Sequence, residues 1–433
     1  MFVLPLLLLL QLLLTYLEVV VMTTVLEEEA KLDGRLDIVQ LSRAPTDELH
    51  TIVFARKQNN LELLESMLLS ASDPHHPHYG KHLTKHEVNA ITSNEEATHK
   101  IYQFLRKHHI NILNSTYFDD YIPAVSTINK WEELFGAEFY VFQQTTDPFK
   151  KFIRCLKYSL PDDISRYVET AFNTVQIPDI YTSRRATKVL VSPLMDVLDT
   201  NIIGYTTPSL INNVYRIENN VGSKRGSQAV YAILDQQMSP SDLTYFQQRF
   251  ELPIESINSS VGGHVSDTAC AFDINDCIEA NLDVQYLMAV SQSVPTTFYY
   301  WEGNDVWLDW IVNMANMLKP PQVISISYGS YELSMSKSYI KAFDVEAMKL
   351  GMMGVTLVAA SGDDGVSGFM ARNGNIPCDY YADFPASSPY VTAVGGTMVT
   401  DVMTYDPIYY CLIVIKFIYY KDNTYDLIYS ICC

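Results

Sequence analysis

Apolar strands that run directly into polar turns restrict the fold of this chain more than any other feature. Val355–Ala360 leads straight into Ser361-Gly362-Asp363, and Gln228–Leu234 ends in the same way at Asp235. A helix signal follows at Ser239-Pro240, because proline is tolerated at the first helical position. Strands that alternate with helices indicate an α/β domain with a parallel sheet. Polar groups at strand ends of such a sheet indicate its ligand-binding edge.

Length and composition divide the chain into segments. At 433 residues the chain is too long for one ordinary domain, and its 48% apolar residues are enough for buried cores. We expect folded domains at residues 35–180 and 205–403, with a linker at 181–204. The pair Arg184-Arg185 in this linker is either a processing site or part of an ordinary exposed loop.

The first 25 residues indicate a secretory signal peptide. Leu6–Leu10 and Leu12–Leu14 form its apolar core. The run from Phe2 to Val25 is nearly long enough to cross a bilayer, so a membrane anchor is the alternative. We expect no stable membrane span in the mature form. Glycosylation sequons at Asn114 and Asn258 support export through the secretory pathway.

Residues 35–180 carry both strand and helix patterns. Leu49–Ala55 indicates a strand, Asn60–Ser70 has leucines at helical spacing, and Glu95–His108 indicates a second helix. Ser72–Thr84, between the two helices, is rich in turn-forming residues. These patterns predict a small α+β sandwich.

Composition argues against two classes of function. The formal net charge is −20, whereas nucleic-acid binding needs basic patches, so we expect no nucleic-acid partner. The acidity suits a compartment in which carboxylates are neutralised, although it also serves solubility. The seven cysteines lack zinc-ligand spacing. An oxidising compartment allows disulfides, for example Cys270 with Cys277, but the sequence does not choose the pairing.

Two carboxylates one helical turn apart form the strongest candidate site. Glu279 and Asp283 are four residues apart, so they share one face of a helix that continues through Ala280–Ala289. One can act as a general base while the other orients it. Asp363, after an apolar strand, could stabilise a developing oxyanion. Because His264 is the one histidine beyond residue 109, a Ser-His-Asp triad has a single candidate base. The pattern predicts acyl transfer in acid.

Four motifs, in the correct order, resemble those of the sedolisins, the serine-carboxyl peptidases. Residues 277–286 (CIEANLDVQY) look like their E-x-x-x-D helix, and 360–365 (ASGDDG) resemble their oxyanion-aspartate segment. Residues 384–397 (FPASSPYVTAVGGT) are similar to the strand block that follows. Upstream, 54–60 and 72–84 look like the activation propeptide. The resemblance covers about residues 35–403.

The resemblance implies a subtilisin-like α/β catalytic domain, preceded by a ferredoxin-like α+β prodomain that covers the active site. Glu279 would be the general base, Asp283 would orient it, and Asp363 would donate to the oxyanion in its protonated form. Above roughly pH 6, an ionised Asp363 would repel the oxyanion, which predicts an acid optimum. The expected reaction is cleavage of peptide or protein substrates, by tripeptidyl-peptidase or endopeptidase action. The expected location is a lysosome-like acidic compartment or the outside of the cell.

The sequence departs from the family toward its C-terminus. The family's nucleophile lies in an S-G-T-S segment downstream of V-G-G-T, and its calcium loop is also C-terminal; this sequence contains neither. Ser361, Ser387 and Ser388 match structural positions of the motifs. We therefore expect an incomplete catalytic domain with no nucleophile and no bound calcium or other metal, followed by an atypical tail at 404–433. The alternative function is a catalytically dead form that acts as a binding or inhibitory prodomain fragment.

The histidines suggest regulation by pH. Nine of the ten lie in the first 109 residues, and five of these fall between His75 and His86. A metal cluster is one interpretation, but no cysteine or acid completes a ligand set there. A pH trigger is another, because charging these histidines near pH 6 would weaken the prodomain's hold. Solvated loop histidines are the third interpretation.

Overall fold

The computed structural model describes residues 23–27, 37–145, 148–178, 206–302, 305–368, 371 and 377–396. Its contacts separate two compact units. The first unit contains Met1–Ala30, Ile38–Gln58 and Ser93–Gln176, and the second contains Lys31–Asp37, Asn59–Thr92 and Ile177–Cys433. The linker at 181–204, the tail at 404–433 and the signal peptide up to residue 22 lie outside the described residues. The predicted domain boundaries therefore stay predictions.

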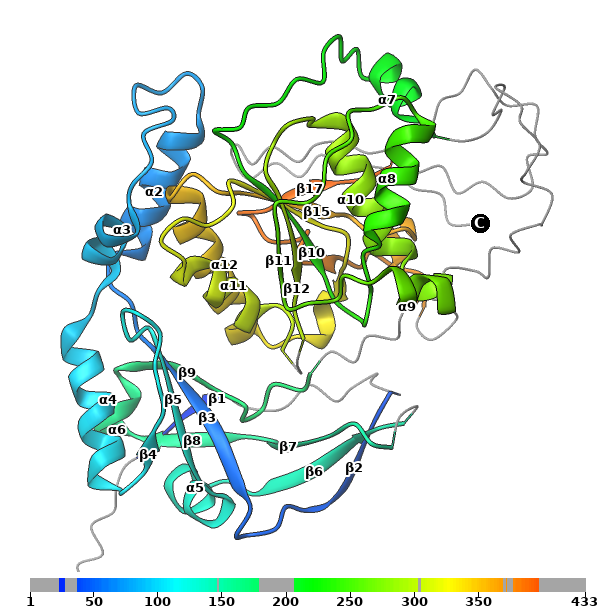
Figure 1. Cartoon of the computed structure of the whole chain (residues 1–433). Coiled ribbons are helices and arrows are strands. Elements are labelled where there is room, and N and C mark those ends of the chain that lie inside the picture. The colour runs from blue at the N-terminus through cyan, green and yellow to red at the C-terminus, as the bar shows by residue number, and fades with distance from the viewer. Residues whose placement is uncertain are drawn as a thin grey trace, which may run out of the picture. The chain divides into compact units, whose positions relative to one another are not determined.

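The first unit is an α+β arrangement of antiparallel strands (Figure 1). Its strands form the sheets β4-β5-β3-β9, β2-β6-β7 and β1-β8. The strands are β1 (Thr23–Glu27), β2 (Ile38–Arg43), β3 (Leu49–Arg56), β4 (Asn111–Ile112), β5 (Tyr121–Thr127), β6 (Phe139–Gln144), β7 (Lys151–Cys155), β8 (Tyr158–Pro161) and β9 (Val168–Phe172). The helices are α4 (Glu95–Lys107), α5 (Ile128–Phe135) and α6 (Asp162–Ser165). The predicted strand at 49–55 and helix at 95–108 are confirmed as β3 and α4.

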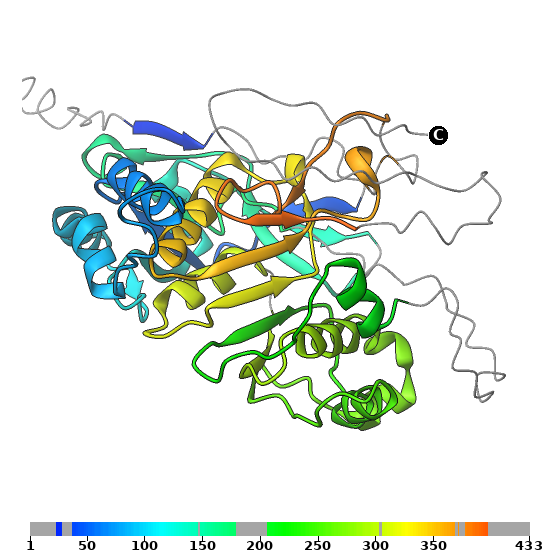
Figure 2. The same cartoon turned by 90° about the horizontal axis from the view of Figure 1, so that it is seen from above.

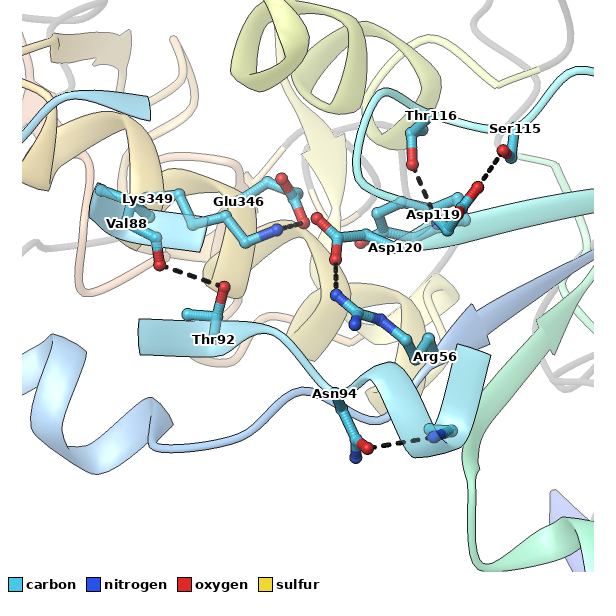
Figure 3. A network of polar contacts seen from close by, with 12 residues as sticks. Arg56, Val88, Thr92, Asn94, Ser115, Thr116, Asp119, Asp120, Glu346 and Lys349 are labelled. Carbon is cyan, nitrogen blue, oxygen red and sulfur yellow. Dashed lines mark hydrogen bonds and ion pairs between the residues drawn. The ribbon is translucent and has the colours of Figure 1, made fainter. Parts of the chain in front are cut away.

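Aromatic side chains fill the centre of the first unit. Trp131 and Phe135 are one turn apart on α5, and both pack against Phe54 of β3, with ring centroids 6.2 and 6.1 Å away. All three side chains are fully buried. Beside them Arg56 forms a buried ion pair with Asp120 (Figure 3). Removing one partner of a buried pair leaves an uncompensated charge, so this contact fixes β3 against the segment before β5.

The second unit is built on a six-stranded parallel sheet with helices on both faces (Figure 1 and Figure 2). The sheet order is β11-β12-β10-β13-β15-β17, and every neighbouring pair is parallel. The strands are β10 (Gln228–Ala232), β11 (Ser259–Val261), β12 (Thr296–Tyr300), β13 (Val323–Ile326), β15 (Thr356–Ala360) and β17 (Thr392–Val394), with a separate β14 (Ser330–Tyr331) and β16 (Asp383–Phe384) pair. The helices are α2 (Leu61–Ser72), α3 (Lys85–Thr92), α7 (Pro208–Val214), α8 (Pro240–Arg249), α9 (Asp267–Phe272), α10 (Ile278–Val290), α11 (Leu308–Asn316) and α12 (Lys337–Met352).

The sequence patterns locate β10, β15, α10 and the start of α8 to within about two residues. Ser239 is the N-cap of α8, and its Oγ accepts a hydrogen bond from the backbone N of Asp242 (3.0 Å). The strand predicted at 228–234 stops at Ala232, because Leu234 and Asp235 adopt φ of 62° and 59°, which an extended strand does not allow. The α/β assignment with a parallel sheet is confirmed.

The α2–α3 hairpin belongs to the second unit although it lies early in the chain. Leu64 and Leu68 of α2 pack in one buried cluster with Met348 and Met352 of α12. The backbone N of Leu83 donates to the carbonyl O of Met352 (2.9 Å). On α12 itself, Lys349 and Glu346 form a buried ion pair, also drawn in Figure 3. The hairpin is therefore part of the core of this unit.

Candidate active site

Helix α10 begins at a point fixed by a disulfide and a glutamine. Cys277 is the N-cap residue and is bonded to Cys270, which settles the pairing that the sequence left open. Gln236, in the loop after β10, accepts hydrogen bonds through Oε1 from the backbone N of Glu279 (3.0 Å) and of Ala280 (3.4 Å). A residue from another loop thus accepts hydrogen bonds from backbone N–H groups in the first turn of α10, which holds Glu279 in position.

Both predicted carboxylates flank the buried face of α10. Ala280, Val284 and Met288 are buried in one cluster with side chains of β10 and β12. Glu279 and Asp283 directly precede Ala280 and Val284, so they lie at the border of this face. Glu279 is half-buried, and Oδ2 of Asp283 is fully buried. The helix therefore presents a pair of carboxylates of unequal burial.

Ser327 is a site residue that the sequence analysis missed. It is the first residue after β13, and its Oγ donates to Asp283 Oδ1 at 2.6 Å. A serine at the end of a strand carries no sequence signal, so nothing in the chain pointed to this contact.

The environment of Asp283 favours its protonated form. Burial raises the pKa of Asp283 well above its usual range, and the negative charge of Glu279 and a hydrogen bond between the two carboxyl groups add to the rise. The Ser327 donor opposes it, because it stabilises the ionised form. In a pair of carboxyl groups of unequal burial, the proton is held preferentially on the more buried one, here Asp283.

The segment around Asp363 lies at the same edge of the sheet. β13 and β15 are parallel neighbours with Ile326 opposite Ala359, so Ser327 and Ser361-Gly362-Asp363 both follow the carboxyl ends of their strands. Asp363 is exposed. Gly362 has φ 92°, and a Cβ built on it would overlap with Oδ2 of Asp383. Glycine is required there, and the strand ends bring the predicted acids to one edge.

His264 and Asp235 form a second group at this edge. His264 Nε2 lies 3.9 Å from Asp235 Oδ1, and its ring stacks on Tyr300 with centroids 3.4 Å apart. Leu234, Asp235 and His264 all have positive φ, and strained backbone of this kind gathers at functional sites. Ser266, the serine nearest to His264 in sequence, caps α9 instead, accepting from the backbone N of Ala269 at 3.2 Å.

The serines of the predicted motifs take structural roles. Ser388 Oγ donates to Asp344 Oδ1 at 2.6 Å, and Ser388 is buried. The backbone N of Ser361 donates to the carbonyl O of Val394, which joins the ends of β15 and β17. Ser387 begins a turn through its backbone N, which donates to the carbonyl O of Asp383. These hydrogen bonds connect the three serines to parts of the fold other than the helix that carries Glu279.

Other predicted features lie on the surface. Asn114 and Asn258 are exposed, as glycan acceptors must be. The rings of His76 and His78 contact each other in the loop between α2 and α3. Within the described ranges, no group of three or more His, Cys, Asp or Glu side chains could hold a metal ion. None of the described helices has the length and apolar character required to cross a bilayer.

The N-terminal part of the chain is similar to a family of activation domains. Residues 37–176 match the family described as Pro-kumamolisin, activation domain. This range contains the first unit from β2 to β9 and also the α2–α3 hairpin of the second unit.

Among curated proteins the chain is similar to tripeptidyl-peptidase 1. The identity is 31% over 380 residues with the protein of Macaca fascicularis and 30% over 378 residues with that of Homo sapiens, in each case across 83% of this chain. The Dictyostelium discoideum protein is 28% identical over 383 residues. The chain spans 63% of the length of the primate relatives.

Solved structures with some likeness to this chain include two peptidases. Pseudomonas sedolisin, a serine-carboxyl proteinase, has 21% identity and a TM-score of 0.35, covering 45% of this chain and 55% of its own. The epidermin leader peptide processing serine protease of Staphylococcus aureus has 12% identity and a TM-score of 0.35, covering 81% and 70%.

Proposed function

We propose that the chain belongs to the sedolisin family of serine-carboxyl peptidases, and that the complete protein is an acid-active peptidase made as a zymogen. Its substrates are peptides or proteins, and release of tripeptides from free N-termini is the reaction that the relatives suggest. The site works in a lysosome-like acidic compartment or outside the cell.

The pairing of Asp283 with Ser327 and Glu279 is the observation that carries this proposal. Asp283 keeps the shared proton and donates it in a hydrogen bond to Glu279, so Glu279 stays ionised in acid. Glu279 then removes the proton from the attacking serine hydroxyl and later returns it to the leaving amine. Ser327 is a positioning residue, because it fixes the orientation of the Asp283 carboxyl group.

Asp363 supplies the oxyanion contact in this mechanism. In its protonated form it donates a hydrogen bond to the oxygen that becomes negative when the scissile carbonyl is attacked. Activity should fall as the pH rises, since an ionised Asp363 repels that oxygen. The attacking serine belongs to the S-G-T-S segment of the family, which this sequence does not contain. No step in this scheme uses calcium, whose family loop is likewise not in this sequence.

The family relationship also supports finer structural proposals. The parallel sheet with helices on both faces fits a subtilisin-like catalytic domain, and the first unit with α2–α3 fits a ferredoxin-like prodomain. The prodomain is the protein's own partner over the active site. Export brings a cleaved signal peptide, glycans on Asn114 and Asn258, and cleavage within 181–204.

The test is to express the complete coding sequence, acidify the product and follow cleavage of a peptide with a free N-terminus. Glu279→Gln and Asp363→Ala should each lower kcat by about 10²–10⁴-fold. Glu218→Gln, which changes an exposed carboxylate in the same unit, is the control and should leave kcat unchanged. The same peptide with an acetylated N-terminus separates tripeptidyl release, which acetylation blocks, from endopeptidase action.

Ser327 needs a measurement that a purely structural role would not affect. Ser327→Ala should raise the pKa of Asp283 in a ¹³C NMR titration of its carboxyl group, because the donor that stabilises ionised Asp283 is lost, and Ser327→Thr should restore it. If all site variants retain full activity, the assignment is wrong. If the complete coding sequence ends at Cys433 and shows no activity, the alternative of a binding or inhibitory prodomain fragment is favoured.

A further inference from the structure

We propose that His50 is a proton-operated switch within the first unit, and that its protonation in an acidic compartment loosens the fold of the activation domain. The proposal builds on the zymogen function above, because it names the group through which acid acts on that domain. It moves the predicted pH trigger away from the exposed histidines of the loop between α2 and α3 to a single partly buried histidine on β3.

The ring of His50 is partly buried against two other elements, and its backbone is bonded to a third. Nε2 lies 2.7 Å from the carbonyl O of Asn173, in the turn after β9. Phe139, at the start of β6, meets the ring edge-on, with centroids 5.5 Å apart. The backbone O of His50 accepts a hydrogen bond from Trp131 Nε1 of α5 at 2.9 Å. Turning the imidazole out to water would break its hydrogen bond to Asn173 and its contact with Phe139.

These contacts fit the neutral imidazole. A carbonyl oxygen can only accept, so Nε2 carries the hydrogen and Nδ1 is left with its lone pair. Arg154 lies close by: its Nη2 donates to Asn173 Oδ1 (3.0 Å) and its Nε to the carbonyl O of Gln176 (2.6 Å). A second proton on His50 would put a positive charge near this fixed guanidinium group.

Burial is the main reason that His50 resists protonation. Desolvation of the ring lowers the pKa of His50 to about 4, the carbonyl of Asn173 opposes this, and the charge of Arg154 adds to it. The neutral form is therefore favoured until the surroundings become strongly acidic or the unit opens.

Acidic groups on the neighbouring elements are engaged elsewhere or stand apart from the ring. Glu132 of α5 and Glu138, just before β6, both bind Arg43, at 2.6 and 2.7 Å. The other charged side chains on the elements packed against β3 lie on α5, α4 and β9, and Glu48 precedes β3 itself. They are Lys130 and Glu133 on α5, Glu95, Glu96, Lys100, Arg106 and Lys107 on α4, and Glu169 on β9. None of these is among the groups that shift the His50 titration.

The coupling between protonation and folding determines how pH changes the stability of the first unit. A histidine whose pKa is lower in the folded state binds its proton more tightly when the unit is unfolded, so stability is lost as the pH falls through 6.5 toward 4. The ratio of unfolded to folded first unit should rise by about tenfold to a hundredfold between pH 7.5 and pH 4.5 from this one group.

The experiment uses the full chain labelled with 5-fluorotryptophan. Trp131 is the tryptophan of the first unit, and Trp301, Trp307 and Trp310 lie in the second, so ¹⁹F NMR reads both units in one sample. Urea titrations at pH 7.5 and pH 4.5 should show the Trp131 transition moving to lower urea in acid. His50→Gln keeps an N–H donor for Asn173 and should remove most of that shift.

Two control variants separate this switch from the other histidines. His99→Gln alters an exposed histidine on α4 in the same unit and should retain the full acid shift. The combined His75→Gln, His76→Gln and His78→Gln variant tests the loop and should also retain it. A Trp131 transition that does not move with pH in the native sequence, or that moves equally in His50→Gln, overturns the proposal.

A direct titration covers the case in which His50→Gln fails to fold. In the unaltered chain with ¹³Cε1-labelled histidine, the pKa read from the His50 signal should be about 4, and a midpoint near 6.5 refutes the switch. Neither readout needs peptidase activity. If His50 titrates as proposed but the complete protein has no peptidase activity, the switch proposal stands and only the proposed function is refuted.

Discussion

Replacement of Asp344 by Asn should remove a pH dependence from the second unit that is opposite in sign to that of His50. Asp344 lies on α12, and its Oδ1 accepts a hydrogen bond from the buried Ser388 (2.6 Å). Burial raises the pKa of Asp344 to about 6, the Ser388 donor opposes the rise, and the charge of Glu332 adds to it. The folded second unit therefore favours the protonated, neutral form of the Asp344 carboxyl group.

The size of the expected change in stability follows from the shift in the pKa of Asp344. The pKa rises from 3.8 to about 6, and each unit corresponds to about 1.4 kcal/mol, so ionisation in the folded state costs about 3 kcal/mol. Because the folded pKa is the higher one, the free energy of unfolding has its full value below pH 4. It falls as the pH rises through 6, and levels off above about pH 7.

The assay is urea unfolding followed by the ¹⁹F signals of Trp307 and Trp310, which lie in the second unit. Between pH 4 and pH 7.5 the free energy of unfolding should fall by about 3 kcal/mol more in the native sequence than in Asp344→Asn. Ser388→Ala is the matched variant. It removes the donor that stabilises the ionised carboxylate, so it should steepen the fall. Parallel pH profiles for the native sequence and Asp344→Asn would refute the reasoning.

Three further substitutions test the packing. Gly362→Ala should destabilise the second unit by about 1–3 kcal/mol in a urea titration, because its Cβ meets a neighbouring carboxylate at φ 92°. Gly263→Ala, at φ 76° in open space, isolates the backbone strain and should cost less. Leu64→Ala should lower the free energy of unfolding by about 2–5 kcal/mol, because it leaves a cavity in the core. Leu63→Ala, on the exposed face of α2, should change it by no more than about 0.5 kcal/mol. Equal losses would contradict the packing of α2 on α12. Cys277→Ser opens the short disulfide loop and should cost about 2 kcal/mol, measured against the oxidised and the reduced native chain.

Local patterns were enough to predict some of the elements that position the site. The leucines of α2, the Ser-Pro start of α8 and the apolar runs of β10 and β15 each act within a few residues, so their signals survive in the sequence. The Glu279–Asp283 pair was predictable for the same reason, because residues four apart on a helix must be neighbours.

Contacts between distant segments were not predictable. The Ser327–Asp283 bond joins residues 44 apart, and the capping of α10 by Gln236 depends on where a separate loop ends. A histidine at the start of a strand, such as His50, looks the same in sequence whether its ring is partly buried or solvated. Each of these contacts depends on how separate elements pack together. Such packing leaves no short local pattern in the sequence.

The position of the α2–α3 hairpin has a consequence for the order in which the chain folds. Its hydrogen bond from Tyr390 to Glu65 spans 325 residues, and Lys85 bonds to the carbonyl O of Asn316 across 231. During synthesis Leu64 and Leu68 must wait, exposed, until α12 has emerged from the ribosome. Closing such long loops costs entropy before any contact is gained, so this step is expected to be slow. Substitutions in the hairpin should therefore appear first as poor secretion and aggregation of newly made chains, even where the finished protein tolerates them.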